Sequence, residues 1–478
     1  MNIITLIKIT FVVLGLSALT GCATNPVTGD TDFVLMSEES EIKLGKQSHK
    51  AIIKQYSIYH DEALQKLVND LGQKLAEKSH RSHLDFKFTL LDSPQVNAFA
   101  LPGGYIYITR GIMSYMNNEE ELAGVLGHEI GHVTARHGVR QHSAQTTAGL
   151  LGAIATIATG SKGVADLTGQ LSNALVRGYG RGHELEADRL GAEYLAVTGY
   201  DPHKMLGVVG ILKDQETFEL QRAKEENRPP RVYHGVFSTH PRNDQRLQEV
   251  VRAAEKYKNP TARITNPEDF LRYLDGATFG DSEEQGIIHG NRFYHKELDL
   301  VIEFPGDWKI DNQPTQLVAL RQDRKAALTI QIDQPNRNES SAEYLKRKFP
   351  QLLKGQSINR RSYTGLVNAD TPFGHGPVRV ASVFHGGRAY VLSLFSGGPL
   401  PDQPFFETAN SIRKLKRHEK KYAEEKKIRL VRVSKGDTFA KLAKKSNLDQ
   451  YAEEQLRLLN GMYPDGEPAI GQLIKIIK

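Results

Sequence analysis

The stretch Gly127-His128-Glu129-Ile130-Gly131-His132 decides how the first half of this chain is interpreted. On an α-helix, residues four positions apart lie one turn apart on nearly the same face. His128 and His132 can therefore direct their imidazoles at a single metal ion. Glu129, displaced by one position, reaches a water beside that ion. The pattern predicts a metal centre built on one helix.

The flanking residues predict that this helix spans residues 118–137. Asn118 is a favourable N-cap, and Glu121 three positions later gives a start that resembles a capping box. The apolar face of the helix consists of Leu122, Val125, Leu126, Ile130 and Val133. At this point the alternative remains open that two histidines lie near a helical glutamate without binding metal.

A catalytic zinc ion typically keeps three protein ligands and one open position, so a third ligand is needed. A metzincin would place a glycine and a third histidine at positions 135 and 138, but this chain has Ala135 and Gly138 there. His137 lies one position before the place where a metzincin would have its third histidine. The third ligand must therefore come from elsewhere.

A second predicted helix, over residues 183–198, begins His183-Glu184-Leu185-Glu186-Ala187-Asp188-Arg189. Glu184 and Asp188 are four positions apart and share a face. One carboxylate can bind metal while the other accepts a hydrogen bond from a ligand imidazole. A solvated acidic helix face is the alternative for this segment.

Four motifs in a fixed order resemble one family. They are Asn97–Gly104 (NAFALPGG), the HEIGH stretch, Glu184–Asp188 (ELEAD), and Ser238-Thr239-His240-Pro241 followed by Arg246. Over about residues 35–255 the chain resembles the gluzincin metallopeptidases, which include the CAAX prenyl protease, the HtpX heat-shock protease and the periplasmic β-barrel assembly-enhancing type.

The resemblance implies a role for each matching residue. His128, His132 and Glu184 correspond to the ligands of one Zn²⁺ ion per chain, Glu129 to the catalytic base, and Asp188 to the acid that supports a ligand histidine. Hydrolysis would proceed through a zinc-activated water, with Glu129 moving the proton.

Further roles follow from the same resemblance. His240 and Arg246 match residues that line the active site, and either could stabilise the oxyanion. A neutral His240 could instead occupy the open zinc position and keep the enzyme latent. Glu186 has no counterpart in the family. Its position near Glu184 nevertheless makes it the fallback ligand, which would bind the metal in place of Glu184. Tyr105–Thr109 resembles the family's edge strand, which pairs with the substrate backbone.

The N-terminus predicts a lipoprotein signal peptide over residues 1–21. Lys8 precedes an apolar run from Ile9 to Leu19, which is the layout of a secretory signal and short for a spanning helix. Leu19-Thr20-Gly21-Cys22 resembles a lipobox, in which the only cysteine of the chain, Cys22, receives the lipid. Ala23 rather than Asp follows it, which by resemblance predicts the outer membrane, facing the periplasm.

The chain as a whole is predicted to be an α+β protein of several domains. After a linker at 22–34, a mainly helical zincin domain with a small sheet is expected over 35–260, an α+β accessory domain over 261–415, and a small module over 428–478.

Within the first domain, residues 148–159 predict a buried or hairpin helix, and the polar stretch 214–232 separates helices at 183–198 and 241–258. Strands of the accessory domain are predicted at Phe293–Phe304, Leu317–Leu320, Ala327–Ile332, Val378–Phe384 and Ala389–Phe395.

The last segment resembles a LysM module with a strand–helix–helix–strand plan. The resemblance rests on Lys435-Gly436-Asp437-Thr438, on Leu458-Leu459-Asn460-Gly461 and on the final apolar strand, whereas Ile470 stands where proline is usual. It implies binding to peptidoglycan glycan. A stabilising domain that binds nothing is the alternative.

These observations favour an envelope endopeptidase that acts on misfolded proteins, outer-membrane proteins among them. The rival is a latent or non-catalytic chaperone or adaptor tethered to peptidoglycan, and a peptidoglycan hydrolase is a third interpretation. The net charge of +6 is dispersed and accompanies no nucleic-acid motif, so a nucleic-acid partner is not expected.

Overall fold

The computed structural model describes most of the chain. The described residues are 22–143, 180–228, 230, 243–257 and 262–478, except positions 30, 35, 264, 314 and 449. The signal peptide, the apolar stretch 148–159 and His240 lie outside them. Among the described residues, no helix combines the length and apolarity that crossing a bilayer requires.

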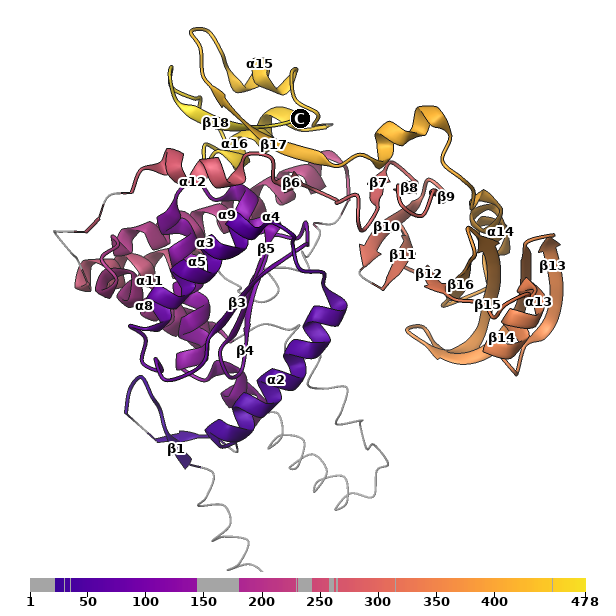
Figure 1. The fold of residues 1–478 in the computed structure, drawn as a ribbon, viewed down its shortest axis with the longest axis horizontal. Coiled ribbons are helices and arrows are strands. Elements are labelled where there is room, and N and C mark those ends of the chain that lie inside the picture. Colours follow the sequence, from indigo (N-terminus) through magenta and orange to yellow (C-terminus); the bar gives the residue numbers. More distant parts are fainter. Residues whose placement is uncertain are drawn as a thin grey trace, which may run out of the picture. The chain divides into compact units, whose positions relative to one another are not determined.

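The chain forms two compact units (Figure 1). The first consists of Met1–Ala277 and Lys427–Lys478, and the second is Thr278–Lys426. Both units combine helices with β-sheets, which confirms the predicted α+β class.

A three-stranded sheet lies at the centre of the first unit. Its strands are β3 (Lys87–Leu91), β4 (Ala98–Leu101) and β5 (Tyr105–Thr109), in the order β3-β5-β4, with β5 parallel to β3 and antiparallel to β4. The prediction that Tyr105–Thr109 is an edge strand is therefore wrong. The chain adds β4 beside β5, so β4 ends the sheet among the described residues.

Helices cover both faces of this sheet because its side chains alternate between them. Helix α2 (Glu38–Gln55) packs Ile52 and Ile53 against Leu91, Leu101 and Tyr107 on one face. Helix α3 (Glu62–Ala76) lies on the other face, where Gly72 lets its backbone approach the ring of Phe88.

The remaining helices of the first unit follow the sheet in sequence. They are α4 (Arg110–Tyr115), α5 (Glu119–Thr134), α8 (Arg181–Val197), the 3₁₀ turn η2 (Pro202–Lys204), α9 (Met205–Glu225), α11 (Asn243–Lys256) and α12 (Pro267–Leu274); a short hairpin, β1 (Cys22–Thr24) with β2 (Thr31–Phe33), precedes α2. Helix α9 extends through 214–225, where the sequence predicted a polar connection. Its buried Leu212, Gln215 and Phe218 give it a packed face despite its polarity.

The C-terminal module packs against this helical layer. Strands β17 (Lys426–Arg432) and β18 (Leu473–Ile477) pair antiparallel and enclose α15 (Phe439–Ala443) and α16 (Ala452–Leu459). Lys475 of β18 is fully buried, and its Nζ donates hydrogen bonds of 2.7 Å to the carbonyl oxygens of Ser114 and Met116. These carbonyls belong to the C-terminal end of α4, so the lysine supplies donors that this helix end lacks.

The second unit is built around an antiparallel seven-stranded sheet in the order β10-β11-β12-β16-β15-β14-β13. The strands are β10 (Trp308–Gln313), β11 (Gln316–Arg321), β12 (Ala326–Asp333), β13 (Leu353–Asn359), β14 (Ser362–Thr371), β15 (Gly374–His385) and β16 (Arg388–Ser396). The other elements are β6 (Thr278–Phe279), β7 (Ile287–His289), β8 (Arg292–His295), β9 (Leu300–Glu303), α13 (Ser341–Lys348), α14 (Asp402–Ser411) and η3 (Arg417–Ala423).

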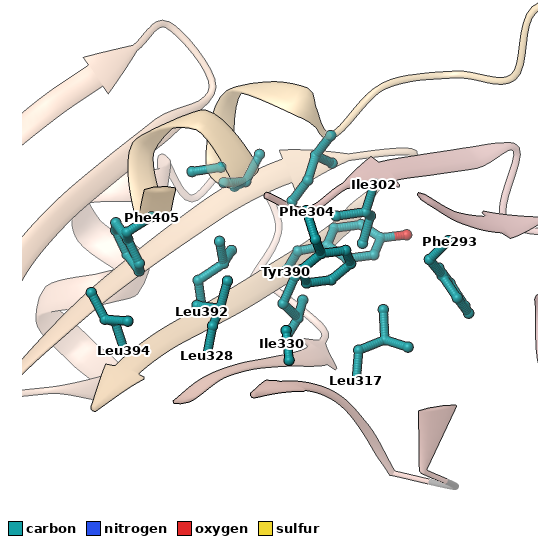
Figure 2. Packing of buried hydrophobic residues seen from close by; sticks show 14 of the residues in the cluster. Phe293, Ile302, Phe304, Leu317, Leu328, Ile330, Tyr390, Leu392, Leu394 and Phe405 are labelled. Carbon is teal, nitrogen blue, oxygen red and sulfur yellow. The ribbon is translucent and has the colours of Figure 1, made fainter. Parts of the chain in front are cut away.

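Two helices cover opposite faces of the seven-stranded sheet. On one face, Phe405 of α14 packs with Leu392 and Leu394 in a large aliphatic and aromatic core (Figure 2). On the other face, Leu345 of α13 packs against Val380 and its neighbours. The core of this unit is therefore a conventional apolar one.

Candidate metal centre

The two histidines of the HEIGH stretch converge on one point. Helix α5 begins where the sequence predicted, since the Asn118 side chain accepts a hydrogen bond of 2.9 Å from the Glu121 amide. One turn separates His128 and His132, and their Nε2 atoms lie 3.0 Å apart. Both side chains are buried, at 4% and 1% exposure.

Glycines allow α8 to approach α5 closely. A Cβ atom added to Gly131 would lie 3.1 Å from the Ala187 backbone, and one added to Gly191 would lie 3.1 Å from the His128 amide nitrogen. Such contacts are tighter than packed side chains normally allow, so larger residues would push the helices apart. The close approach carries the first turn of α8, with Glu184, to the two histidines.

Glu184 completes a three-residue cluster. Its carboxylate oxygens lie 3.6 Å from His128 Nε2 and 3.5 Å from His132 Nε2. The three ligand atoms fall within 4.8 Å of one another. Two imidazoles and one carboxylate, all buried, are a donor set that suits zinc with one position left for water. The residues present therefore fit the predicted ion.

Asp188 lies behind His128, one turn further along α8. Its Oδ1 is 2.9 Å from His128 Nδ1, and Arg246 of α11 donates two hydrogen bonds of 2.7 Å to the same carboxylate. Burial alone would raise the pKa of Asp188, but the Arg246 guanidinium holds it below its usual range. Burial alone would lower the pKa of His128, but Asp188 and Glu184 raise it to about 9.

Arg246 also lies 3.7 Å from a Glu184 oxygen, and its guanidinium is buried. This arrangement links α11 to both acidic positions of α8. The side chain therefore balances the negative charge of the cluster. Its predicted role at an oxyanion stays a prediction.

Glu129 lies on the same helix as the two histidines and is 1% exposed. Its carboxylate is close enough to interact with the Arg246 charge. A buried carboxylate next to the ligand set has the chemistry of a proton acceptor and donor. The structure thus brings together His128, Glu129, His132, Glu184, Asp188 and Arg246, while His240 is outside the described residues.

A second group of polar residues adjoins His132, and the sequence did not predict its role. His132 Nδ1 lies 2.8 Å from His137 Nδ1, and His137 Nε2 lies 3.1 Å from Glu186 Oε2. Arg140 donates to the same glutamate oxygen at 3.1 Å. Burial alone would raise the pKa of Glu186, but His137 and Arg140 lower it to about 2. Glu186, the fallback ligand, lies outside the three-residue cluster.

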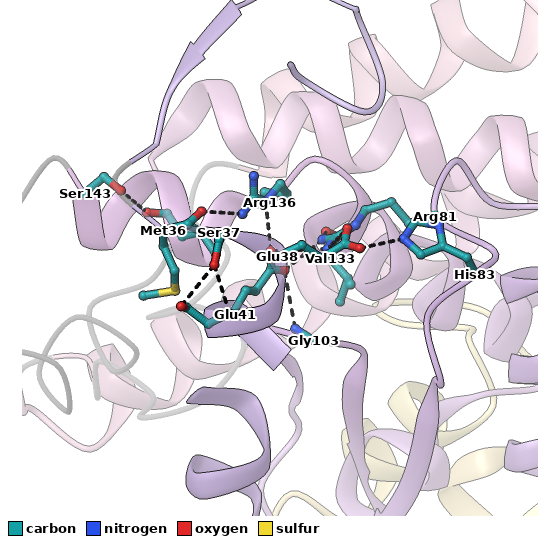
Figure 3. A network of polar contacts seen from close by, with 12 residues as sticks. Met36, Ser37, Glu38, Glu41, Arg81, His83, Gly103, Val133, Arg136 and Ser143 are labelled. Atoms are coloured by element: carbon teal, nitrogen blue, oxygen red, sulfur yellow. Dashed lines mark hydrogen bonds and ion pairs between the residues drawn. The ribbon is translucent and has the colours of Figure 1, made fainter. Parts of the chain in front are cut away.

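A buried ion network fixes the C-terminal end of α5 (Figure 3). Arg81 donates at 2.8 Å to Glu41 of α2 and at 2.9 Å to the Val133 carbonyl. Arg136 donates at 2.8 Å to the other Glu41 oxygen. The Gly103 amide, in the turn between β4 and β5, also donates to Glu41. The network joins α2, the sheet and the metal-binding helix.

Comparison with known families is consistent with this geometry. Residues 62–254 match Peptidase family M48, and residues 431–476 match the LysM domain. The chain carries an M48 peptidase domain. The matched span contains every residue of the cluster, and members of the M48 metalloprotease family use zinc. The C-terminal module is a LysM domain.

Relatives of the M48 domain occur in bacteria and in mitochondria. The "Beta-barrel assembly-enhancing protease" of Yersinia pestis is 32% identical over 52% of this chain and 50% of its own length, and that of Escherichia coli K12 is 30% identical over the same shares. The "Mitochondrial metalloendopeptidase OMA1" of Arabidopsis thaliana is 32% identical over 31% of this chain and 30% of its own length. The chain spans about half the length of the bacterial relatives.

Proposed function

We propose that this chain is a membrane-anchored zinc-dependent endopeptidase that hydrolyses misfolded proteins of the bacterial cell envelope. The observation that carries the proposal is the convergence of His128, His132 and Glu184 within 4.8 Å, with Glu129 on the same helix. A structural zinc site would not need Glu129, and such sites are usually closed by four Cys or His ligands.

The proposed mechanism assigns one task to each group. Zinc bound by the three ligands would activate a water and polarise the scissile carbonyl. Glu129 accepts the proton that the attacking water loses and delivers it to the leaving nitrogen. A C–O bond forms as the C–N bond breaks, so no covalent enzyme intermediate is needed. Asp188 accepts the Nδ1 proton of His128, so the lone pair of His128 Nε2 would be directed at the metal.

Substrate binding along β4 is supported by the position of this strand. It ends the sheet among the described residues, and Ala100 and Leu101 line a small hollow together with His132. A peptide that adds to the outer edge of β4 would gain backbone hydrogen bonds and pass beside the ligand set. The proposal replaces β5 with β4 as the substrate-pairing strand.

Localisation and partners follow from the sequence and from the relatives. We propose that residues 1–21 are removed, that Cys22 is lipidated, and that the protein faces the periplasm from the outer membrane. The names of the bacterial relatives make outer-membrane proteins the first substrates to examine. The proposed limits are linker 22–34, peptidase 35–260, accessory domain 261–415 and LysM module 428–478, the last offering contact with peptidoglycan. A Cys22→Ser variant should lose membrane attachment, and one that still fractionates with membranes contradicts the anchor.

A latent or non-catalytic chaperone or adaptor is the competing proposal. One observation favours it, because His128, His132 and Glu184 are each at most 4% exposed, which leaves a substrate little access. Under this proposal His240 would act as the latch.

The deciding experiment compares the lipid-free chain with Glu129→Gln, using a dye-labelled unfolded protein as substrate and measuring bound zinc in both. We expect zinc in both and cleavage by the unaltered chain alone, with the variant slower by about 10³-fold or more. If both hold zinc and neither cleaves, a His240→Ala variant that cleaves would establish latency. If that variant is also inactive, the endopeptidase proposal is wrong.

A further inference from the structure

The two ligand histidines are supported in different ways. His128 Nδ1 faces the Asp188 carboxylate directly, at 2.9 Å. His132 Nδ1 instead faces a second imidazole, that of His137, whose ring centroid is 4.9 Å away at an interplanar angle of 71°. His137 is fully buried.

The hydrogen-bond partners determine where the protons lie. An ionised carboxylate only accepts, so the contact between Glu186 and His137 places a proton on His137 Nε2. In a neutral imidazole the other nitrogen, Nδ1, is then an acceptor. It can accept only if His132 carries its proton on Nδ1. That tautomer of His132 leaves the Nε2 lone pair directed at the cluster.

We propose that His137, held by Glu186 and Arg140, is a positioning residue that fixes the tautomer and ring orientation of His132 for metal binding. The inference rests on the metal centre of the proposed function. The Glu186 carboxylate acts on the ligand through an intervening histidine, whereas Asp188 acts on His128 directly. Ligand imidazoles are commonly oriented by such acceptors, and the loss of one weakens metal binding.

The local backbone explains how a residue five positions after His132 returns to it. Helix α5 ends at Thr134, and Arg136 adopts a left-handed conformation with φ 54°. The chain then resumes a helical course at 137–143. This turn, stabilised by the pair between Arg136 and Glu41, directs the His137 side chain back toward His132.

The test measures zinc affinity rather than activity, by competition with a chromophoric chelator. His137→Ala removes the acceptor, whereas His137→Asn keeps an amide oxygen near the position of Nδ1. We expect the alanine variant to bind zinc about 10- to 100-fold more weakly, and the asparagine variant to recover most of that loss. His385→Ala is the matched control, because His385 is a buried histidine of the second unit whose Nε2 donates to the Asp299 carbonyl at 3.0 Å.

Glu186→Gln provides a second variant of nearly unchanged shape, with an expected loss of about three- to tenfold because the amide can no longer act only as an acceptor. Thermal unfolding of the zinc-free proteins identifies any variant that fails to fold. Unchanged affinity in both His137→Ala and Glu186→Gln overturns the inference, as does equal weakening by alanine and asparagine at position 137. An unaltered chain that binds no zinc would instead refute the metal centre itself.

Discussion

The two units of the molecule bury different chemistry. The interior of the first holds charged side chains in matched sets, such as Asp188 with Arg246 and Glu41 with Arg81. The core of the second, around Leu392 and Phe405, is aliphatic and aromatic. Burying a charged side chain is costly unless an opposite charge is paired with it. Each buried ion pair therefore requires both partners to be present in one specific geometry. An apolar core tolerates many combinations of hydrophobic side chains of similar total volume, so its composition gives little indication of function.

The largest effect is expected at the metal centre. Glu184→Gln removes the only anionic ligand of the cluster, so the chain should lose zinc and at least about 10³-fold in activity, because the ion supplies several kcal/mol to the reaction. Glu193→Gln, on the same helix, is the matched control and should keep both. Metal analysis and a peptidase assay measure the outcome. A Glu184→Gln variant that retains zinc and most activity would contradict the ligand assignment.

The second prediction concerns the buried network of Figure 3. Arg81→Met leaves Glu41 with Arg136 as its guanidinium partner and deprives the Val133 carbonyl of a donor. We expect the free energy of unfolding of the first unit to fall by about 3 kcal/mol, the lower end for a broken buried pair. Arg272→Met, at an exposed arginine, should change it by less than about 0.5 kcal/mol. Chemical denaturation of the zinc-free protein distinguishes the two, and equal costs would refute the network's contribution.

The third prediction concerns the apolar core of the second unit. Leu392 is completely buried, so Leu392→Ala should lower the free energy of unfolding of this unit by about 3 kcal/mol through the lost contacts and the cavity. Ile332→Ala is the control, since Ile332 is half exposed on a paired strand. Calorimetry should show that only the transition of the second unit shifts, while zinc affinity stays unchanged. A loss of zinc affinity would show that the two units are coupled.

Much of the metal-binding helix could be predicted from the sequence because its information is local. The cap at Asn118 and the four-residue spacing of His128 and His132 depend only on helix geometry. The prediction of Glu184 as the third ligand required more than local geometry, because only the family resemblance selected it over Glu186. The α+β class also followed from local patterns, and the comparisons with known families confirm it.

Contacts between distant segments could not be predicted in the same way. The role of His137 depends on the left-handed turn at Arg136 and on Glu186, 49 residues later. The order of strands in the sheet depends on pairing between separate segments, which local patterns do not encode. The prediction that β5 is an edge strand is wrong for this reason: β5 is the central strand, and four of its five residues are buried. Helix α9 was missed because its buried face includes a polar glutamine.

The smallest effect is expected at Lys475, where the LysM module meets α4. Burial lowers the pKa of Lys475 to about 7, against the attraction of Glu121. An unfolded lysine keeps its proton up to about pH 10.4, so between pH 7 and 10 the unfolded chain binds more protons at this site than the folded chain. The free energy of unfolding should therefore rise with pH across this window, by at most about 1.4 kcal/mol per pH unit.

Lys475→Met removes this contribution, so the stability of the unaltered chain relative to the variant should increase from pH 7 to 9. Urea denaturation at several pH values measures the difference, and Lys441→Met, at a lysine on α15 whose side chain donates to the Gly436 carbonyl, serves as the control. A pH-independent difference would mean that Lys475 remains charged in the folded state. In that case Glu121 and the two α4 carbonyls would stabilise a buried ammonium, and the module would be attached through an ionic contact.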